Sequence, residues 1–355
     1  MAKTKKILLK GNEAVVYGAL LAGCECYFGY PITPASEIAH ASARMFPLLG
    51  RVFIQAECEI ASINMVYGAA AAGRRAMTAS SGLGISLKQE GVSYIAGAEL
   101  PAVIIDVMRG GPGLGNIAPE QSDYNQITKG GGHGGYKCIV LAPGSVQEMC
   151  DLTMLAFDLA DEYRTPVYVL ADGVIGQMME SVKLPEPEDR PYDPEWKMGK
   201  VVDGKANIVT SIYLEHNDLE AINHKLQAKY AEVVANEQRS EELYTDDAEL
   251  VIVAYGICSR VAAGAIEQLR AEGYKVGMLR PQMVWPFPSD ALMKIATNGK
   301  CKGFLSLELS AGQMIEDVRL AIECKKPVHL YNRMGGNVPS CDEVVEAAKK
   351  VLKEI

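Results

Sequence analysis

Two glutamates separated by one residue follow a short apolar segment, in the string Gln55-Ala56-Glu57-Cys58-Glu59. A carboxylate after a predicted strand and just before an apolar helix acts either as a partner of the helix dipole or as a buried acid with a tuned proton affinity. The second role suits general acid–base chemistry. The sequence therefore marks this pair as a candidate acid–base site.

A single arginine, Arg109, opens a glycine-dense stretch that covers residues 110–135. A guanidinium group binds a carboxylate through a planar, bidentate fork. A long glycine-rich loop next to apolar segments is more often a ligand surface than a structural accident. Arg109 is therefore a candidate for holding an anionic ligand.

Two more turns carry polar residues at predicted strand ends. Thr33 precedes Pro34, which predicts a helix that starts here with Thr33 as its cap and Pro34 at the first helical position. Residues 78–84, Thr-Ala-Ser-Ser-Gly-Leu-Gly, predict a strand-to-helix turn whose backbone can approach a flat ligand.

The elements that position these residues are those of a parallel α/β sheet, because short apolar segments alternate with helical patterns. Open α/β sheets bind ligands at the carboxyl ends of their strands, where all four segments fall. The expected strands are 25–29, 52–55, 76–79, 102–107, 138–141 and 166–170, and the expected helices are 12–22, 60–72, 85–96 and 146–163.

A proline cluster between residues 185 and 194 ends this pattern. A second α/β pattern follows, in which Ser259 is the expected cap of a helix at 260–272. We expect a first domain at 1–183, a linker with a helix at 184–247 and a second domain at 248–355.

Composition excludes several classes of protein. With 355 residues, 48% of them hydrophobic, and a net charge of −9, the chain has no basic nucleic-acid footprint. Its longest charge-free stretch, the fourteen residues 60–73, is too short to span a bilayer. Phosphate-loop, dinucleotide and metal-ligand motifs are absent, and nine cysteines without a framework indicate reduced thiols. We expect a cytoplasmic protein with no nucleic-acid or membrane partner and no metal ligands of its own.

Taken together, the motifs resemble the alpha subunit of the thiamine-diphosphate-dependent 2-oxoacid:ferredoxin oxidoreductases, most closely the 2-ketoisovalerate (3-methyl-2-oxobutanoate) type. The resemblance extends over nearly the whole chain and is weakest at 195–245. The matching strings are residues 11–14, 29–36, 55–59, 109–116, 129–134 and 171–180.

This resemblance implies two doubly wound parallel-sheet domains, a pyrimidine-binding domain for thiamine diphosphate and a domain like the C-terminal one of transketolase. The Gly-Asp-Gly motif that holds the diphosphate and Mg²⁺ is missing, since residues 171–173 and 202–204 match it poorly. The cofactor is therefore expected to be shared with a beta subunit. Iron–sulfur clusters of the [4Fe-4S] type are expected on partner subunits (beta, gamma and delta), with ferredoxin as electron acceptor and coenzyme A as acyl acceptor.

The resemblance also implies roles for individual residues. Glu57 would bind N1′ of the aminopyrimidine, with Glu59 as its rival and otherwise a helix-end charge. Arg109 and Thr33 would hold the substrate carboxylate. His133 is either an acid–base group or a loop histidine satisfied by the backbone. The residues expected around the cofactor are Pro31, Glu57, Ser80, Ser81 and Gly82.

The expected reaction is the coenzyme A-dependent oxidative decarboxylation of a 2-oxoacid to acyl-CoA and CO₂, with reduction of ferredoxin. A branched-chain substrate is favoured, because the strand-end segments hold no second arginine for a distal carboxylate. Alternatives are a 2-oxoglutarate or pyruvate type of the same family, and a non-catalytic nucleotide-binding regulatory subunit.

Overall fold

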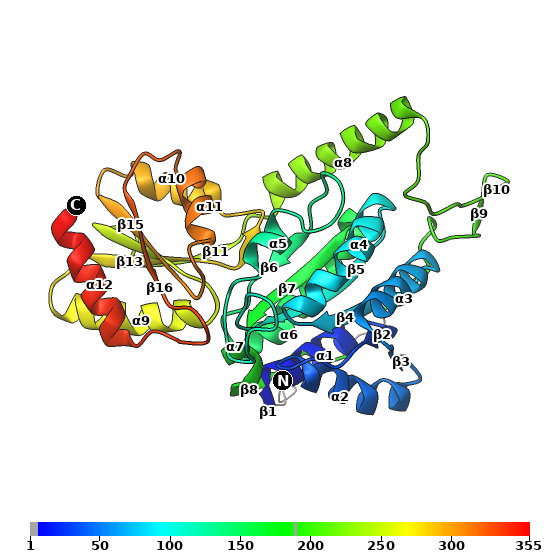
Figure 1. Cartoon of the computed structure of the whole chain (residues 1–355), viewed down its shortest axis with the longest axis horizontal. Coiled ribbons are helices and arrows are strands. Elements are labelled where there is room, and N and C mark those ends of the chain that lie inside the picture. The colour runs from blue at the N-terminus through cyan, green and yellow to red at the C-terminus, as the bar shows by residue number, and fades with distance from the viewer. Residues whose placement is uncertain (1–5, 188–189) are drawn as a thin grey trace.

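The computed structural model describes residues 6–187 and 190–355 as two α/β units lying side by side (Figure 1). A seven-stranded sheet forms the core of the larger unit, and a five-stranded sheet forms the core of the smaller one. Most neighbouring strands in both sheets run parallel, which confirms the predicted fold class.

The first sheet has the strand order β14–β6–β7–β5–β4–β2–β3. Its strands from one edge to the other are β14 (Met283–Trp285), β6 (Ile139–Leu141), β7 (Pro166–Asp172), β5 (Ala102–Met108), β4 (Ala76–Ser80), β2 (Cys26–Gly29) and β3 (Val52–Gln55). Every residue of the central strands β5 and β7 is buried, as expected for a parallel sheet covered on both faces.

Helices cover both faces of this sheet and create two apolar layers. The layer on one face contains α3 (Glu59–Ala71) and α4 (Leu83–Gly97), whereas the layer on the other contains α1 (Gly11–Leu21), α6 (Val146–Tyr163) and α2 (Ser36–Met45). Both β3 and α6 have the bounds that the sequence predicted.

The second sheet has the order β11–β13–β12–β15–β16. Its strands are β11 (Ser240–Leu243), β13 (Val276–Pro281), β12 (Leu250–Val253), β15 (Gly303–Glu308) and β16 (Val328–Asn332). The helices α9 (Gly256–Ala271) and α12 (Cys341–Glu354) cover one face, and α10 (Ser289–Thr297) and α11 (Met314–Ala321) cover the other.

One strand crosses the boundary that the sequence predicted between the two halves. β14 belongs to the C-terminal part of the chain, yet it pairs antiparallel with β6 at the edge of the first sheet. Met283 and Val284 of this strand are buried in the core clusters that the first sheet shares with its helices. The two units are therefore joined through a common sheet edge.

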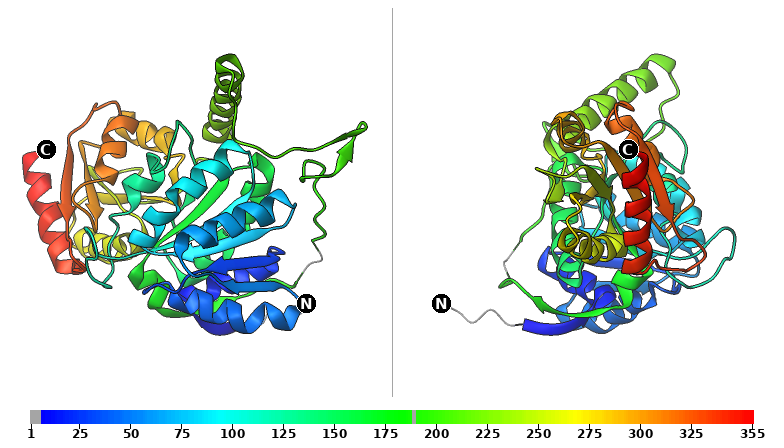
Figure 2. Two further views of the ribbon diagram at one scale, coloured as in Figure 1. Left: turned by 45° about the vertical axis from the view of Figure 1, so that its right-hand side comes forward. Right: turned by 90° about the vertical axis from the view of Figure 1, so that its left-hand side faces the viewer.

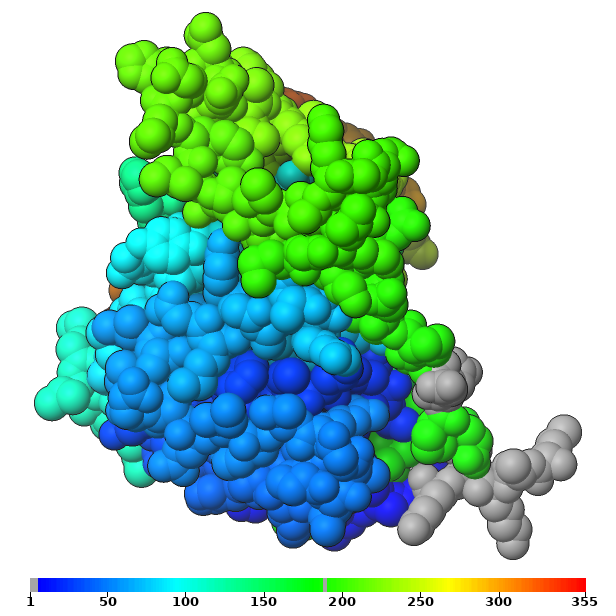
Figure 3. Space-filling model, turned by 90° about the vertical axis from the view of Figure 1, so that its right-hand side faces the viewer, coloured from blue at the N-terminus to red at the C-terminus, as the bar shows by residue number. Residues whose placement is uncertain are grey.

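The segment between the two units includes a hairpin that projects from the body of the molecule (Figure 2), and its green residues cover the upper part of the face drawn in Figure 3. It contains β8 (Met179–Lys183), which pairs with β1 (Lys6–Lys10), then the small hairpin of β9 (Val201–Val202) and β10 (Lys205–Ala206), and then α8 (His216–Asn236). Only three residues of α8 are buried, and all three lie in its C-terminal half.

Two further short helices, α5 (Tyr124–Thr128) and α7 (Gly173–Gln177), and a 3₁₀ turn at Pro47–Leu49 complete the described chain. None of the helices in the described residues is long and apolar enough to cross a membrane. All nine cysteines carry free thiols.

The strand order reverses between β2 and β4, because the chain runs from β2 outward to the edge strand β3 and then returns to β4 on the other side. Such a reversal opens a crevice at the carboxyl ends of the two strands. The loops that follow β2, β3, β4 and β5 lie at this end of the sheet, and they contain the four segments that the sequence singled out.

Candidate functional site

Arg109 joins two loops at this crevice. Its Nη1 donates to the carbonyl oxygen of Thr33 at 3.0 Å, and its Nη2 donates to the carbonyl oxygen of Leu114 at 3.2 Å. The structure therefore brings Arg109 and Thr33 together, as the sequence predicted. Two of the five guanidinium N–H groups are used in this way, which leaves three for a ligand.

The predicted cap at Thr33 is wrong. The helix α2 begins at Ser36, and its N-cap residue is Ala35. Thr33 instead lies in the loop before the helix, is exposed, and is tied to Arg109 through its carbonyl oxygen. Thr33 is therefore a loop residue beside Arg109 rather than a helix cap.

The structure also corrects the expected environment of the two glutamates. Glu57 lies in a turn before α3 and is exposed, whereas Glu59 is the first residue of α3 and only 5% exposed. Cys58, the N-cap residue, accepts a hydrogen bond from the backbone N–H of Ala61. The buried acid at this position is therefore Glu59, whereas Glu57 stands at the surface of this subunit.

A small polar space lies between Glu59 and the turn after β4. A Cβ atom on Gly84 would be 2.2 Å from Ser80 Oγ and 2.7 Å from Glu59 Oε1, so both oxygens reach into the space that the missing side chain leaves. The hydroxyl groups of Ser80 and Ser81 are buried and have no hydrogen-bond partner within residues 6–187 and 190–355. Buried polar groups without partners are rare in native proteins, which makes these hydroxyl groups candidates for contact with a ligand.

This donor and acceptor set fits an aminopyrimidine ring. A carboxyl group can bind a ring nitrogen, and unpaired hydroxyl groups can bind exocyclic or ring nitrogens. Gly82 adds a turn with φ +49°, and its Cβ position would lie 3.5 Å from Arg109 Cγ. The predicted cofactor residues Ser80, Ser81 and Gly82 therefore lie between the buried acid and the arginine. Pro31 lies half-buried in the loop after β2.

A cleft of about 820 Å³ opens beside this turn and extends to the second unit. Arg109 is the one cation among the described residues that line it, and Glu120 and Asp123 are the carboxylates. The lining residues are Gly82, Leu83, Ser86, Arg109 to Gly113, Glu120, Ser122, Asp123, Asn125, Gln126, Ala311, Gln313, Met334 and Gly335.

Two buried aspartates lie behind the cleft. Asp106 of β5 is fully buried, and neither of its carboxylate oxygens has a hydrogen-bond partner in the described part of the chain. Burial raises the pKa of Asp106, and the charge of Asp123 raises it further. Burial likewise raises the pKa of Asp123 to about 6, while its Oδ2 accepts the backbone N–H of Gly82 at 3.2 Å. Carboxyl groups so placed favour a shared proton.

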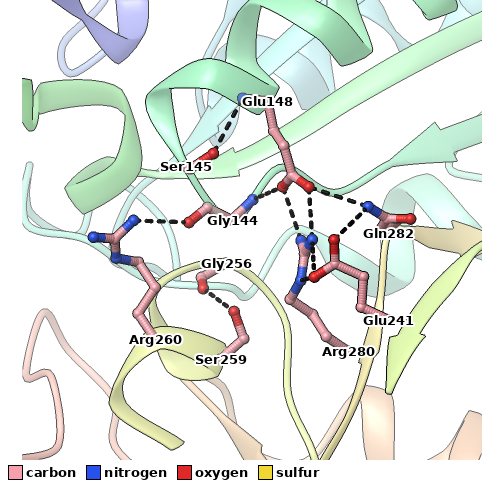
Figure 4. Close-up of polar contacts among 9 residues, drawn as sticks. All are labelled: Gly144, Ser145, Glu148, Glu241, Gly256, Ser259, Arg260, Arg280 and Gln282. Atoms are coloured by element: carbon pink, nitrogen blue, oxygen red, sulfur yellow. Dashed lines mark hydrogen bonds and ion pairs between the residues drawn. The ribbon is translucent and has the colours of Figure 1, made fainter. Parts of the chain in front are cut away.

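Polar contacts hold the second unit against the first. Arg280 of β13 binds both carboxylate oxygens of Glu148 in α6, at 2.9 and 2.6 Å (Figure 4). Glu241 of β11 also contacts this arginine, and Gln282 donates to both glutamates. Arg260 donates to the carbonyl oxygen of Gly144.

Ser259 is not the helix cap that the sequence predicted. It lies inside α9, which begins at Gly256, and its Oγ donates to the carbonyl oxygen of Gly256 at 2.7 Å (Figure 4). The N–H of Ile257 instead donates to the buried carboxylate of Asp172 at 2.7 Å. A side chain of the first unit thus supports the start of this helix, which local sequence did not show.

His133 lies away from the arginine. It is exposed and lines a different hollow, together with Tyr94 of α4 and residues 211–213. The structure therefore does not bring His133 to the crevice. Asp106 and Asp123 were not predicted from the sequence. A carboxylate inside an otherwise apolar strand is a signal that would have indicated Asp106.

Two family models and several known proteins match this chain. A family model described as pyruvate flavodoxin/ferredoxin oxidoreductase, thiamine diphosphate-binding, matches residues 17–242. A second model, pyruvate:ferredoxin oxidoreductase core domain II, matches residues 248–344. The chain is 61% identical over 346 residues to ketoisovalerate oxidoreductase subunit VorB of Methanothermobacter thermautotrophicus, with 97% of each chain covered.

More distant relatives and solved structures agree. The chain is 41% identical to 2-oxoglutarate synthase subunit KorA of Archaeoglobus fulgidus, with 90% of this chain and 92% of the relative covered. A 2-oxoglutarate:ferredoxin oxidoreductase from Magnetococcus marinus, solved with 2-oxoglutarate, coenzyme A and succinyl-CoA, matches with a TM-score of 0.87 at 29% identity, over 99% of this chain and 66% of that one. A split-gene transketolase shares the fold, with a TM-score of 0.60 at 15% identity, over 97% and 98% of the two chains.

The two matched regions together span most of the sequence, and a relative with well over half of its residues identical matches end to end. The chain therefore belongs to the thiamine-diphosphate-dependent 2-oxoacid:ferredoxin oxidoreductases, of which it is one subunit.

Proposed function

We propose that this subunit acts on a branched-chain 2-oxoacid of the ketoisovalerate type. The observation that carries the proposal is the charge of the cleft, where Arg109 is the single cation among the described lining residues. One guanidinium group suits the one carboxylate of an apolar 2-oxoacid. The names of the 61% and 59% identical relatives point to the same substrate.

A 2-oxoglutarate substrate is the second candidate, favoured by the similarity to KorA proteins. Its distal carboxylate requires a second cation. The described cleft presents Glu120 and Asp123 instead, and these would repel that group. We therefore rank the branched-chain substrate first.

Thiamine diphosphate, when bound, supplies the nucleophilic carbon and the electron sink for decarboxylation. The residues of this chain hold the pyrimidine half: Ser80, Ser81 and Gly82 at the turn after β4, and Pro31 in the loop after β2. A beta subunit holds the diphosphate and Mg²⁺. The beta, gamma and delta subunits carry the [4Fe-4S] clusters that pass electrons to ferredoxin, and coenzyme A receives the acyl group.

The sequence match favoured Glu57 as the acid that exchanges a proton with the N1′ position of the pyrimidine. The proton of this acid must be shielded from bulk water to control the ring nitrogen. Glu59 is buried and reaches the space beside Ser80, whereas Glu57 is exposed in the unassembled chain. We therefore assign the role to Glu59, with Glu57 as the alternative.

Arg109 holds the carboxylate of the substrate, and Thr33, whose carbonyl oxygen accepts a hydrogen bond from Arg109, lies beside it. A fixed cation in a site from which water is excluded orients the keto carbon and stabilises charge that develops beside it. Arg109 is already anchored by two backbone oxygens, so it needs little reorganisation when the substrate arrives.

One experiment tests the substrate and the acid together. The assembled complex is assayed with a panel of 2-oxoacids and a viologen acceptor, and exchange of the C2 proton of bound thiamine diphosphate for deuterium is followed separately. We expect the highest kcat/KM with 3-methyl-2-oxobutanoate. We expect Glu59→Gln to abolish C2 exchange and Glu57→Gln to preserve it. The reverse pattern returns the role to Glu57, and exchange in both variants contradicts the thiamine site at this segment.

A further inference from the structure

Lys88 of α4 carries an ammonium group in the interior of the protein. The residue is fully buried. Its Nζ donates to the hydroxyl group of Ser62 and to the backbone carbonyl oxygen of Glu59, the latter at 3.4 Å. Both acceptors lie in the first turn of α3, so Lys88 stabilises the turn that carries the Glu59 side chain.

The same face of α4 contacts Glu59 at a second point. Gly84 precedes Lys88 by four residues, and residues with this spacing lie one above the other on a helix. The missing side chain of Gly84 leaves room for the Glu59 carboxyl group, while Lys88 binds the Glu59 backbone. The position of Glu59 is therefore set by two neighbouring residues of α4.

A buried ammonium group is costly unless an opposite charge lies close to it. Burial lowers the pKa of Lys88 to about 8, and the charge of Glu59 partly opposes this effect. The other titratable group that acts on Lys88 is the thiol of Cys58, also at the start of α3. Glu59 is thus the carboxylate that compensates this buried charge.

We propose that Lys88 is a positioning residue for Glu59, which it serves by fixing the first turn of α3 through its hydrogen bonds to Ser62 and to the Glu59 backbone. The proposal rests on the proposed function of Glu59. Lys88 touches neither substrate nor cofactor in this scheme. Its effect on the reaction passes through the placement of the neighbouring acid.

The first test needs no cofactor. The full chain is labelled in its lysine side chains, and the Lys88 signal is identified in nuclear magnetic resonance spectra by its loss in Lys88→Met. We expect the signal to titrate near pH 8, as burial predicts. Glu59→Gln should move this midpoint to lower pH, because the compensating carboxylate is gone. The matched control is Glu57→Gln, which should leave it unchanged, and equal effects of the two variants would refute the coupling.

The second test uses the assembled complex and C2 exchange. Lys88→Met keeps an unbranched side chain that is one atom shorter and removes the charge and the hydrogen bonds to α3. Because a small displacement of a reacting group can slow a reaction about 100-fold, we expect exchange to slow about tenfold or more. The affinity for thiamine diphosphate should stay at the wild-type value, which a collapse of the site would not allow.

The control for this variant is Gln89→Met, which also removes a buried polar side chain from α4. Gln89 faces the hydroxyl group of Tyr168 rather than α3, so exchange should keep its rate and pH dependence. Wild-type exchange in Lys88→Met, combined with loss of exchange in Glu59→Gln, would refute the role of Lys88 and leave the proposed function intact. Absence of exchange in the wild-type complex would refute the proposed function, while the titration of Lys88 would still test its coupling to Glu59.

Discussion

The Arg109→Lys substitution preserves the positive charge in the cleft but changes the geometry of its hydrogen bonds. The guanidinium group of Arg109 binds the carbonyl oxygens of Thr33 and Leu114 at 3.0 and 3.2 Å and retains three N–H groups for the substrate. A lysine has three N–H groups in total. It cannot bridge both loops and also present a fork to a carboxylate, although it preserves the positive charge.

The expected loss follows from these contacts. A hydrogen bond to a charged group contributes about 1.5–3 kcal/mol, and the variant loses one such bond to the substrate carboxylate. This corresponds to a decrease of about 10- to 150-fold in kcat/KM for the 2-oxoacid, because each 1.36 kcal/mol is a factor of ten. Binding of thiamine diphosphate to the complex should change little, since Arg109 approaches the pyrimidine turn only through the space beside Gly82.

A second arginine that bridges two backbone carbonyl oxygens provides the matched control. The Nη1 atom of Arg51 also donates to two backbone carbonyl oxygens, those of Leu20 and Cys24, at 3.0 and 2.6 Å, but this residue lies before the amino end of β3, away from the carboxyl ends of the strands. Steady-state kinetics with the assembled complex should show the decrease for Arg109→Lys and wild-type kcat/KM for Arg51→Lys. Equal kinetics of the two variants, or a defect confined to cofactor binding, would remove Arg109 from the substrate site.

Two further predictions concern stability. The raised pKa values of Asp106 and Asp123, caused first by burial, mean that the folded chain binds more protons than the unfolded one, so the free energy of unfolding falls as pH rises from about 4 through about 6. Asp106→Asn should therefore raise the free energy of unfolding by about 1–3 kcal/mol at about pH 7 and leave it unchanged at about pH 4, as measured by denaturant unfolding. Destabilisation at both pH values would contradict a shared proton. For Glu148, the hydrogen bonds and charge of Arg280 outweigh burial and lower the pKa, so its contribution is present at neutral pH and lost as pH falls below about 4. Glu148→Gln should cost about 3 kcal/mol at neutral pH and less in acid, and a loss independent of pH would argue against the ion pair.

Local patterns in the sequence determined most of the architecture. The apolar segments and helical spacings of the first half gave α6 and β3 with their observed bounds, and they placed α3 and α4 within two residues at each end. Burial on both faces of a parallel sheet requires continuous apolar segments, and this requirement is visible without coordinates. The strings around Arg109 and the glutamates also identified the family.

Helix starts were less predictable, because a cap is a local preference worth about 1 kcal/mol that tertiary contacts override. At Thr33 the hydrogen bond from Arg109, which lies 76 residues further along the chain, keeps the residue in the cleft loop. At Ser259 the carboxylate of Asp172 supports a helix that begins three residues earlier. Neither partner is visible from the neighbouring sequence.

The choice between Glu57 and Glu59 shows the same limit at the centre of the site. Both glutamates follow β3, and either one can precede an apolar helix, so the sequence determined that an acid stands here and left open which one is buried. The structure shows that Glu59 is the buried one, because α3 begins at this residue and the absence of a side chain at Gly84 leaves space for its carboxyl group. Burial of this carboxyl group depends on the packing of α3 against α4, because Glu59 and Gly84 lie 25 residues apart in the sequence. Only the tertiary structure shows that the two residues are in contact.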